Sequence, residues 1–444
     1  MSGDMLFVMS PMLYRANLDF FFCSRKETLI FVLRIKQKES DMSRIIKNIG
    51  AVIGWGFNRV AKLAGNVLSL CICCVLPVKK GRVMCWAYSF KQYSCNPRYL
   101  TEYLLEHNPE YEVYWVFRNK VDVSGIDKRI HVVRYGSWQY YLLVNTAEFL
   151  ATNARTDPWR IYWHKRPQQK YIMLWHGGVA LKRIEKDAER ELGFSYVMKA
   201  KRDSKACDLM VSGCRMQSEL LKQKFWYDGE VLECGVPRND IFFQTARHAA
   251  LREKVCAQYH IPSGNRIVLY APTFRRNRSL DPYRVDWERV LPYLRSLYGG
   301  EEVTLLLRLH PNLLDKVDVS ALVEGKGVID VTRYHDMQEL LCISDMLITD
   351  YSSSMFDFGM LMRPCLLYAT DAEQYDRGYY FDFASLPFPL ARSEQELIDA
   401  IRTFDAKRYG DDLQTFFAEK VGLMEKGDAC KTLVDWMRQH QIEG

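Results

Sequence analysis

Short apolar runs alternate with segments of helical periodicity along most of the chain. In the first half the predicted strands are 83–90, 112–117, 147–152, 171–175, 209–212 and 230–234. In the second half they are 267–270, 303–309, 327–331, 346–349 and 364–368. Helical patterns at 98–107, 214–224, 286–297, 337–342, 354–361 and 393–404 lie between several of these runs. Such alternation predicts an α/β protein with parallel sheets, and two successive sets predict two Rossmann-like domains facing across a cleft.

The N-terminal eighty residues follow a different pattern. Residues 1–41 are apolar and aromatic but interrupted by charges, so they predict a poorly defined extension, and Met42 is an alternative start. Residues 42–80 are apolar with helical periodicity, and their cleanest part, 63–78, is shorter than the roughly 20 residues that cross a bilayer. Because basic residues bracket the segment, we expect a membrane-associating interfacial helix; a helix packed on the protein's own core is the alternative.

The remaining boundaries follow from the two strand sets. Residues 81–243 are predicted to form an N-terminal Rossmann-like domain. Residues 244–444 are predicted to form a C-terminal Rossmann-like domain with additional helices at its end. In this second domain, Ser393 and Glu396 form a capping-box pattern at the start of a helix.

Charge and cysteine content narrow the class of protein. The net charge is +7, and basic residues gather beside the apolar N-terminal segment and beside the candidate site residues, as an anionic membrane face and an anionic substrate would require. The sequence holds no zinc-knuckle spacing, RNA-binding signature or long basic run, so no nucleic-acid partner is expected. Thirteen scattered cysteines, an odd number, predict reduced thiols in the cytosol.

Candidate chemistry lies where predicted strands end, which is where ligands bind in open α/β sheets. His176 follows the run 171–175 and precedes Gly177 and Gly178, which allow another molecule to approach the backbone. A histidine has a reference pKa near 6.5 and can accept a proton from an attacking hydroxyl at neutral pH. The alternative is a histidine that only hydrogen-bonds its own turn.

Three further strand ends carry groups suited to phosphate. Thr273 and Arg275 follow one run, and an arginine fork matches phosphate oxygens, although an exposed structural arginine is the alternative. Arg308 and His310 alternate at the end of another run and therefore point to one face. The series Thr349, Asp350, Ser352 and Ser353 precedes an apolar helical segment, where hydroxyls and free N–H groups favour an anion or serve as an ordinary helix cap. No metal-binding or dinucleotide motif is present, so neither a metal nor another cofactor is expected.

Six motifs in order resemble the CDP-glycerol glycerophosphotransferase family, the enzymes of teichoic-acid-type polymers. They are 175–177 with Leu181 and Lys182, then 235–240, 270–275, 308–311, 349–353 with Phe356 and Asp357, and 377–382. The resemblance spans about residues 81–390. It implies a GT-B-like fold in which the first domain receives the acceptor and the second binds the donor.

The resemblance also implies roles for individual residues. His176 would be the general base, and His310 would act with it at the reacting phosphate. Arg308, Thr349, Ser352 and Ser353 would surround the donor pyrophosphate, with Lys182, Thr273, Arg275, Asp350 and Asp357 as further substrate-binding positions. Family members commonly carry Thr-Pro after the His-Gly pair, whereas this chain has Gly178-Val179, so the acceptor-side loop departs from the family.

The implied activity is transfer of glycerol phosphate, or ribitol phosphate, from a CDP-polyol to a hydroxyl of a lipid-linked glycan or polyol-phosphate acceptor, with release of CMP. The implied location is peripheral, on the cytoplasmic side of the cell membrane. Two alternatives remain open. One is a glycosyltransferase of the same fold class that uses a nucleotide sugar in wall or capsule synthesis. The other is a non-catalytic membrane scaffold.

Overall fold

The computed structural model describes residues 60–273, 275, 280–310, 313, 318–325, 327–371 and 378–443. The chain divides into two compact units, Met1–Val67 and Leu68–Gly444. Predictions for residues 1–59 lie outside the described residues. A helix covers residues 60–75. Within the part of the chain that the structure describes, no helix has both the length and the apolar character needed to cross a membrane.

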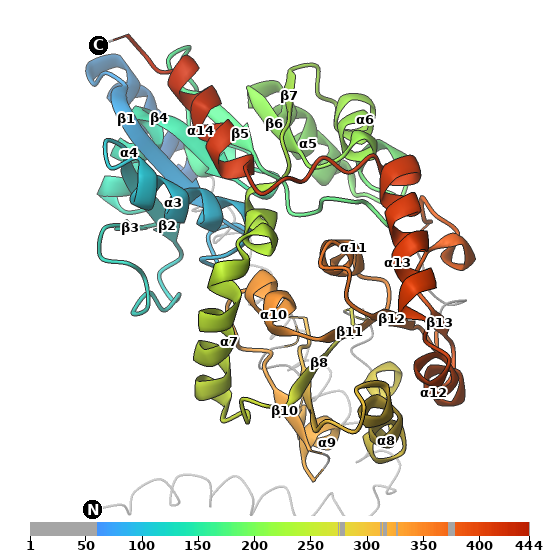
Figure 1. Ribbon diagram of the computed structural model, residues 1–444. Helices are drawn as coiled ribbons and strands as arrows, with labels where there is room; N and C mark the ends of the chain where they lie inside the picture. The colour runs from blue at the N-terminus through green and yellow to red at the C-terminus, as the bar shows by residue number, and fades with distance from the viewer. Residues whose placement is uncertain are drawn as a thin grey trace, which may run out of the picture. The chain divides into compact units, whose positions relative to one another are not determined.

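The first sheet is seven-stranded and parallel, in the order β3-β2-β1-β4-β5-β6-β7 (Figure 1). Its strands are β1 (Lys79–Trp86), β2 (Glu112–Phe117), β3 (His131–Arg134), β4 (Ala147–Thr152), β5 (Lys170–Met173), β6 (Leu209–Ser212) and β7 (Glu230–Glu233). Its helices are α3 (Cys95–His107), α4 (Trp138–Thr146), α5 (Phe194–Ala206) and α6 (Arg215–Lys224), with 3₁₀ turns η2 (Pro158–Ile161), η3 (Glu185–Ala188) and η4 (Pro237–Phe243). Strands β4 and β5 and the second half of β1 are buried because helices cover both sheet faces.

The second sheet is six-stranded and parallel, in the order β10-β9-β8-β11-β12-β13. Its strands are β8 (Arg266–Ala271), β9 (Val303–Leu307), β10 (Val328–Asp330), β11 (Met346–Thr349), β12 (Cys365–Tyr368) and β13 (Leu390–Ala391). The helices around it are α7 (Thr245–Tyr259), α8 (Trp287–Leu297), α9 (Ser320–Val323), α10 (Met337–Ile343), α11 (Ser354–Gly359), α12 (Glu394–Arg402) and α13 (Ala406–Thr415), with 3₁₀ turns η5 (Asp281–Tyr283) and η8 (Phe383–Ser385) and the π-helical turn η9 (Phe416–Val421). Both sheets reverse strand order beside their first strand, as doubly wound dinucleotide-binding folds do.

The last helix, α14 (Ala429–Gln439), returns to the first sheet. Leu433, Trp436 and Met437 of α14 belong to the same buried cluster as Val83 of β1, and the Trp436 indole donates to the Glu230 carboxylate at 2.9 Å (Figure 1). The predicted boundary between residues 243 and 244 falls between η4 and α7. The chain therefore crosses between the two sheets again before α14.

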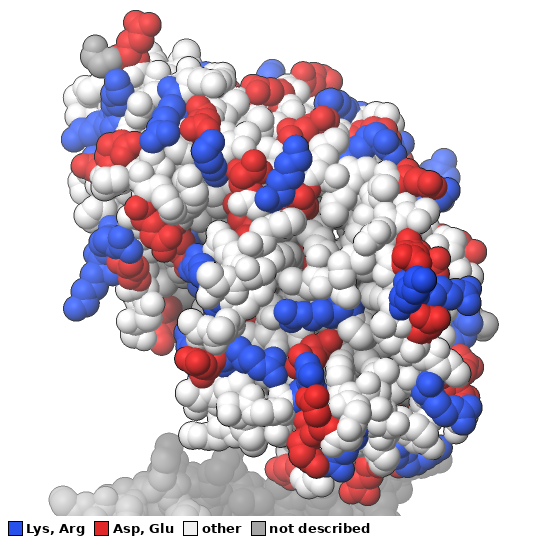
Figure 2. Space-filling view, viewed as in Figure 1, with Lys and Arg blue, Asp and Glu red and all other residues white. Residues whose placement is uncertain are grey.

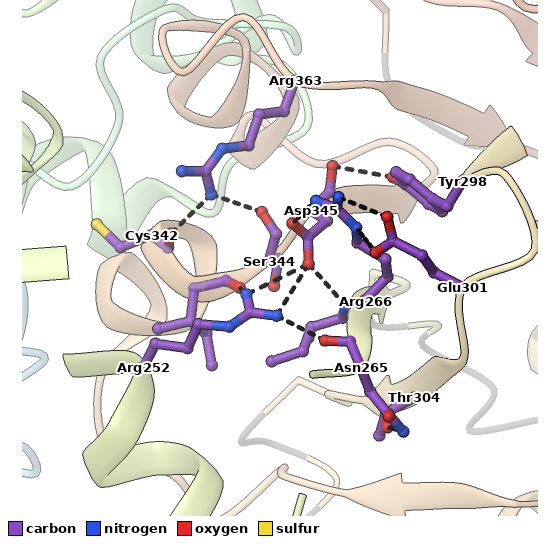
Figure 3. Close-up of polar contacts among 12 residues, drawn as sticks. Arg252, Asn265, Arg266, Tyr298, Glu301, Thr304, Cys342, Ser344, Asp345 and Arg363 are labelled. Atoms are coloured by element: carbon purple, nitrogen blue, oxygen red, sulfur yellow. Dashed lines mark hydrogen bonds and ion pairs between the residues drawn. The ribbon is translucent and has the colours of Figure 1, made fainter. Parts of the chain in front are cut away.

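The amino end of the second sheet is held by one carboxylate, that of Asp345, just before β11. It accepts the backbone N–H of Ile267 at 2.8 Å and both terminal nitrogens of Arg252 at 3.2 Å (Figure 3). Arg266 adds a bond at 3.2 Å and also pairs with Glu301. These contacts link α7 and β8 to the residues just before β9 and β11. They lie at the amino ends of the strands, opposite the carboxyl ends that carry the candidate chemistry.

Most predicted strands are confirmed. The boundaries of β2, β4, β6 and β11 match the expected ones, and the others differ by a few residues. Strands β3 and β13 were not predicted. β3 has only four residues, half-exposed or exposed except one, and β13 has only two, so neither has an apolar run of normal length. The Ser393 cap is confirmed, since its hydroxyl accepts the Glu396 N–H at 3.2 Å.

Candidate active site

A cavity of about 610 Å³ lies where the carboxyl ends of strands from both sheets meet. Segments that follow β1, β5, β8, β9 and β11 line it. The predicted site residues among its lining are His176, Thr273, Arg308, His310, Ser352, Ser353 and Asp357. The cavity therefore brings together predicted residues from both halves of the chain.

The imidazole of His176 is oriented by the main chain of the neighbouring strand segment. Its Nδ1 lies 2.9 Å from the carbonyl oxygen of Asn153, which can only accept, so Nδ1 carries the proton and Nε2 is the free base. The ring is accessible from the cavity and lies 4.4 Å from the Trp175 ring. Desolvation by the surrounding protein lowers the pKa of His176, and the Arg238 charge lowers it further, while the Asn153 contact opposes the shift. At neutral pH the imidazole is thus an uncharged proton acceptor.

The backbone around His176 is strained and held from two sides. Trp175 has φ 46°, in the left-handed region that a large side chain seldom adopts. The His176 carbonyl accepts from Arg238 Nη1, and the Gly177 carbonyl accepts from Gln217 Nε2 at 2.8 Å. At Gly178 an added Cβ would meet only an ordinary contact of 3.8 Å with Asp357 Oδ1. The departure from the family's Thr-Pro is therefore not forced by crowding at this position.

Asp357 connects the two sides of the cavity floor. Its Oδ2 accepts from Arg238 Nη2 at 2.8 Å and from Gln338 Nε2 at 3.0 Å. Burial raises the pKa of Asp357, although the Arg238 charge opposes this shift. Because Oδ2 is bound to these two protein groups, we interpret Asp357 as a lining residue of the cavity that supports Arg238.

Arg308 and His310 lie on one wall, as their alternation predicted. The Arg308 guanidinium donates to the Tyr334 carbonyl at 2.6 Å, and burial lowers its pKa. Burial also lowers the pKa of His310, with further lowering by the charges of Arg308 and Lys182. Arg308 and Lys182 are the two cationic side chains that act on His310, and an anion bound here would offset their repulsion, so this wall is suited to phosphate.

The serine series lies beside that wall. Ser352 Oγ accepts from the Ser354 hydroxyl at 2.8 Å and from the Ser354 N–H at 3.3 Å. Ser352, Ser353 and Ser354 all line the cavity, and α11, which begins at Ser354, has only six residues. Hydroxyl groups rather than a long helix dipole are therefore what this segment offers to a ligand.

Three predicted residues lie behind the cavity. Arg275 forms ion pairs with Asp350 at 2.9 Å and Asp371 at 2.7 Å. It also donates to the Thr273 hydroxyl at 2.8 Å, and Asp350 accepts the Thr273 N–H at 2.8 Å. The Thr349 hydroxyl donates to the Ala271 carbonyl at 2.7 Å. The arginine fork of Arg275 thus binds carboxylates, and these three residues fix Thr273 and the ends of β8 and β11.

Lys182 lies on a loop that joins the two halves of the site. It forms an isolated antiparallel bridge with Tyr379, flanked by Arg183 N–H to Gly378 O at 2.8 Å and Tyr380 N–H to Leu181 O at 2.9 Å. Its charge reaches His310, whose pKa it lowers. The loop after His176 is therefore paired with a segment that follows β12.

Sequence reasoning missed four residues at this site. Asn153 and Gln338 hold His176 and Asp357, and the Tyr88 ring lies 6.0 Å from the His176 ring. Arg238 belongs to the quoted motif 235–240 but was given no role. Only Arg238 had a sequence signal, an arginine directly after a Val-Pro turn.

Charge on the visible surface is mixed. Figure 2 shows Lys and Arg interspersed with Asp and Glu over this face. Within the described residues, no cluster of three or more His, Cys, Asp and Glu side chains is arranged to hold a metal ion.

Comparison with known proteins agrees with this geometry. The chain matches the family described as CDP-glycerol:poly(glycerophosphate) glycerophosphotransferase over residues 69–438. The protein belongs to this family.

Individual relatives extend the match. A teichoic acid poly(glycerol phosphate) polymerase of Staphylococcus epidermidis is 31% identical over 81% of this chain, which spans half of that longer protein. A teichoic acid glycerol-phosphate transferase of Staphylococcus aureus is 31% identical over 77% of this chain and 90% of its own length. A solved structure of a variant of the wall teichoic acid polymerase TagF superposes with a TM-score of 0.72 at 28% identity, covering 86% of this chain and 96% of that one.

Proposed function

We propose that this chain transfers glycerol phosphate from CDP-glycerol to a hydroxyl acceptor and releases CMP. The observation that carries the proposal is that a proton acceptor and an anion site line the same cavity. His176 presents a free, uncharged Nε2 on one wall, and Arg308, His310 and Ser352 offer an anion site on the other. Two Rossmann-like sheets with such a cavity at their strand ends also support a GT-B-like transferase.

The chemistry follows from these positions. The acceptor hydroxyl gives its proton to His176 Nε2 while its oxygen attacks the β-phosphorus of the donor. The bond between that phosphorus and the bridging oxygen breaks, and CMP leaves with the bridging oxygen and its electron pair. Arg308 and His310 stabilise charge on the phosphates, and positioning contributes most of the acceleration.

The first experiment is a donor screen with a membrane-extract acceptor. The full chain is incubated separately with CDP-glycerol, CDP-ribitol and UDP-sugars, and released CMP or UDP is measured. CMP from CDP-glycerol is expected, whereas CMP from CDP-ribitol alone would identify the other polyol. UDP release would favour a glycosyltransferase, and no release from any donor would favour a non-catalytic scaffold.

The second experiment concerns His176. His176→Ala is expected to lose about 10²–10⁴-fold in turnover, as loss of a general base does, while calorimetric CDP-glycerol binding persists. His310→Ala should instead weaken donor binding. A His176→Ala enzyme with normal turnover contradicts the assignment.

The proposed acceptor is a lipid-linked glycan or polyol phosphate at the cytoplasmic face of the cell membrane. Along the helix of residues 60–75, Leu63, Val67 and Leu70 recur at spacings of four and three, and each is more than half exposed. An apolar stripe of this kind with basic neighbours supports peripheral attachment to anionic lipid.

Flotation with vesicles containing phosphatidylglycerol tests this attachment. The triple change Leu63→Gln, Val67→Gln and Leu70→Gln is expected to abolish co-flotation. Tyr293→Gln, at an exposed apolar position on α8, serves as the matched control and should float normally. Equal flotation of the triple variant and the native chain would contradict the proposal.

A further inference from the structure

One buried carboxylate outside the cavity is placed between two glycines. Glu425 lies in the segment between η9 and α14, where the chain crosses back to the first sheet. An ideal Cβ at Gly213 would lie 2.4 Å from Glu425 Oε1, and one at Gly235 would lie 2.6 Å from Oε2. Only glycine leaves room for the carboxylate at these two positions, so the side chain occupies a fitted site.

The two oxygens of Glu425 bind the turn that bears Arg238. Oε2 accepts the Val236 N–H at 3.0 Å, and Oε1 accepts the Asn239 side-chain amide at 2.9 Å. The turn also accepts hydrogen bonds: the Asp240 carboxylate accepts the backbone N–H groups of Ala429 and Cys430, at the start of α14, at 3.0 and 2.8 Å. The crossing segment and the start of α14 therefore bind the turn on both sides of Arg238.

The crossing segment is itself fixed by pairing. Leu423 forms an antiparallel bridge with Cys214, and the Met424 N–H donates to the Gly213 carbonyl at 2.9 Å. Glu425 thus projects from paired backbone, which sets its position independently of the turn it binds. A rigidly placed carboxylate can impose its geometry on that turn.

We propose that Glu425 is a positioning residue for the reaction, holding the turn 235–240 so that Arg238 stays between the His176 carbonyl and Asp357. Through Arg238 it sets the electrostatic environment of the His176 imidazole. The inference rests on the proposed function only in treating His176 as the base.

The electrostatic surroundings of Glu425 favour its protonated form. The pKa of Glu425 is raised from its ordinary value of 4.5 to about 8, chiefly by burial and also by the carboxylates of Asp357 and Asp240, while its bonds to Asn239 and Val236 oppose the rise. The thiols of Cys214 and Cys234 also face it. The group therefore changes charge near the physiological range.

The test compares Glu425→Ala with Glu425→Gln and Glu419→Ala. Glutamine keeps a similar shape and can bind Val236 and Asn239 if the Asn239 amide turns over, whereas Glu419 is an exposed carboxylate in η9. Glu425→Ala is expected to lower kcat on the order of 10²-fold, the effect of misplacing a catalytic group by about 1 Å. KM for CDP-glycerol should stay within about twofold because the phosphate wall is untouched. Glu425→Gln should recover most of kcat, and Glu419→Ala should match the native chain.

A pH readout separates positioning from a general structural role. The Arg238 charge lowers the pKa of His176, so displacement of Arg238 should move the acid limb of kcat/KM to higher pH in Glu425→Ala. Modification of His176 by diethyl pyrocarbonate, followed by mass spectrometry across pH, should show the same movement without any substrate. If native enzyme turns over no donor, the proposed function fails, and the modification profile still decides the role of Glu425.

The proposal is overturned if Glu425→Ala keeps the native kcat and the native modification profile. Should Glu425→Ala not fold, Gly213→Ala decides, because its methyl group would displace Oε1 while leaving the carboxylate in the chain. A folded Gly213→Ala protein with the native modification profile would equally overturn it.

Discussion

Arg238 and Asp357 form an ion pair of 2.8 Å whose side chains are only 5% and 6% exposed. Arg238 comes from η4, just after the first sheet, and Asp357 comes from α11, just after β11 of the second. The pair therefore joins the two halves of the site directly beneath His176. Its other contacts, to the His176 carbonyl and to Gln338, leave little freedom for either group.

Loss of one partner of this pair should be costly. Asp357→Ala is expected to lower the free energy of unfolding by about 3–5 kcal/mol, because the Arg238 charge is left buried and uncompensated. Urea denaturation followed by circular dichroism measures the change. The control is Asp412→Ala, which removes the exposed partner of Arg408 and should cost at most about 1 kcal/mol. Equal effects of the two changes would contradict a buried, mutually dependent pair.

Activity should fall on the acid side of neutrality. The pKa of His176 is lowered from its ordinary value of 6.5, chiefly by desolvation, so the base becomes protonated only below that pH. The acid limb of kcat/KM for CDP-glycerol should therefore have its midpoint below pH 6.5. Initial rates in constant-ionic-strength buffers from pH 4.5 to 8 measure it. A midpoint above pH 7 would be inconsistent with this environment.

Two hydroxyls at neighbouring strand-end positions should behave differently. Ser352 lines the cavity, so Ser352→Ala should weaken CDP-glycerol binding by about 1.5–3 kcal/mol, the range for a hydrogen bond to a charged group. The Thr349 hydroxyl is bound to Ala271, so Thr349→Val should cost about 1 kcal/mol of stability and leave donor affinity unchanged. Titration calorimetry and thermal melting distinguish these outcomes, and weakened donor binding by Thr349→Val would reverse the assignment.

Stability should depend on pH through Glu425. Its pKa of about 8 in the folded chain exceeds the ordinary value of 4.5, so the folded state favours the protonated form. The stabilisation is complete below pH 4.5 and is lost as pH rises through 8. The melting temperature of Glu425→Gln minus that of the native chain should therefore increase between pH 5 and 8 and level off above. A difference that is flat with pH would mean that the carboxyl does not titrate in this range.

The sequence was most informative where a residue's role is local. An apolar run followed by a histidine or hydroxyl located the end of β11, and located the ends of β5 and β9 to within two residues. It therefore predicted several of the residues that line the cavity. It could not predict which polar side chains bind other side chains of the protein rather than a ligand. The partners of Arg275 include Asp371, 96 positions away, and those of Arg238 include Asp357, 119 positions away. Such pairings depend on tertiary structure, so Arg275 resembled a phosphate ligand while Arg238 was left without a role.

The return of α14 to the first sheet has a consequence for synthesis on the ribosome. Leu433, Trp436 and Met437 share a buried cluster with Val83, so the hydrophobic cluster of the first sheet is complete only when α14 has emerged. The strands of the second sheet span residues 266–391 and all emerge before α14. Until α14 has been synthesised, the first sheet therefore exposes apolar surface to solvent or chaperones. Deletion of α14 should therefore leave apolar surface of the first sheet exposed and lower the solubility of that half of the molecule, although it is the half farthest from α14 in sequence.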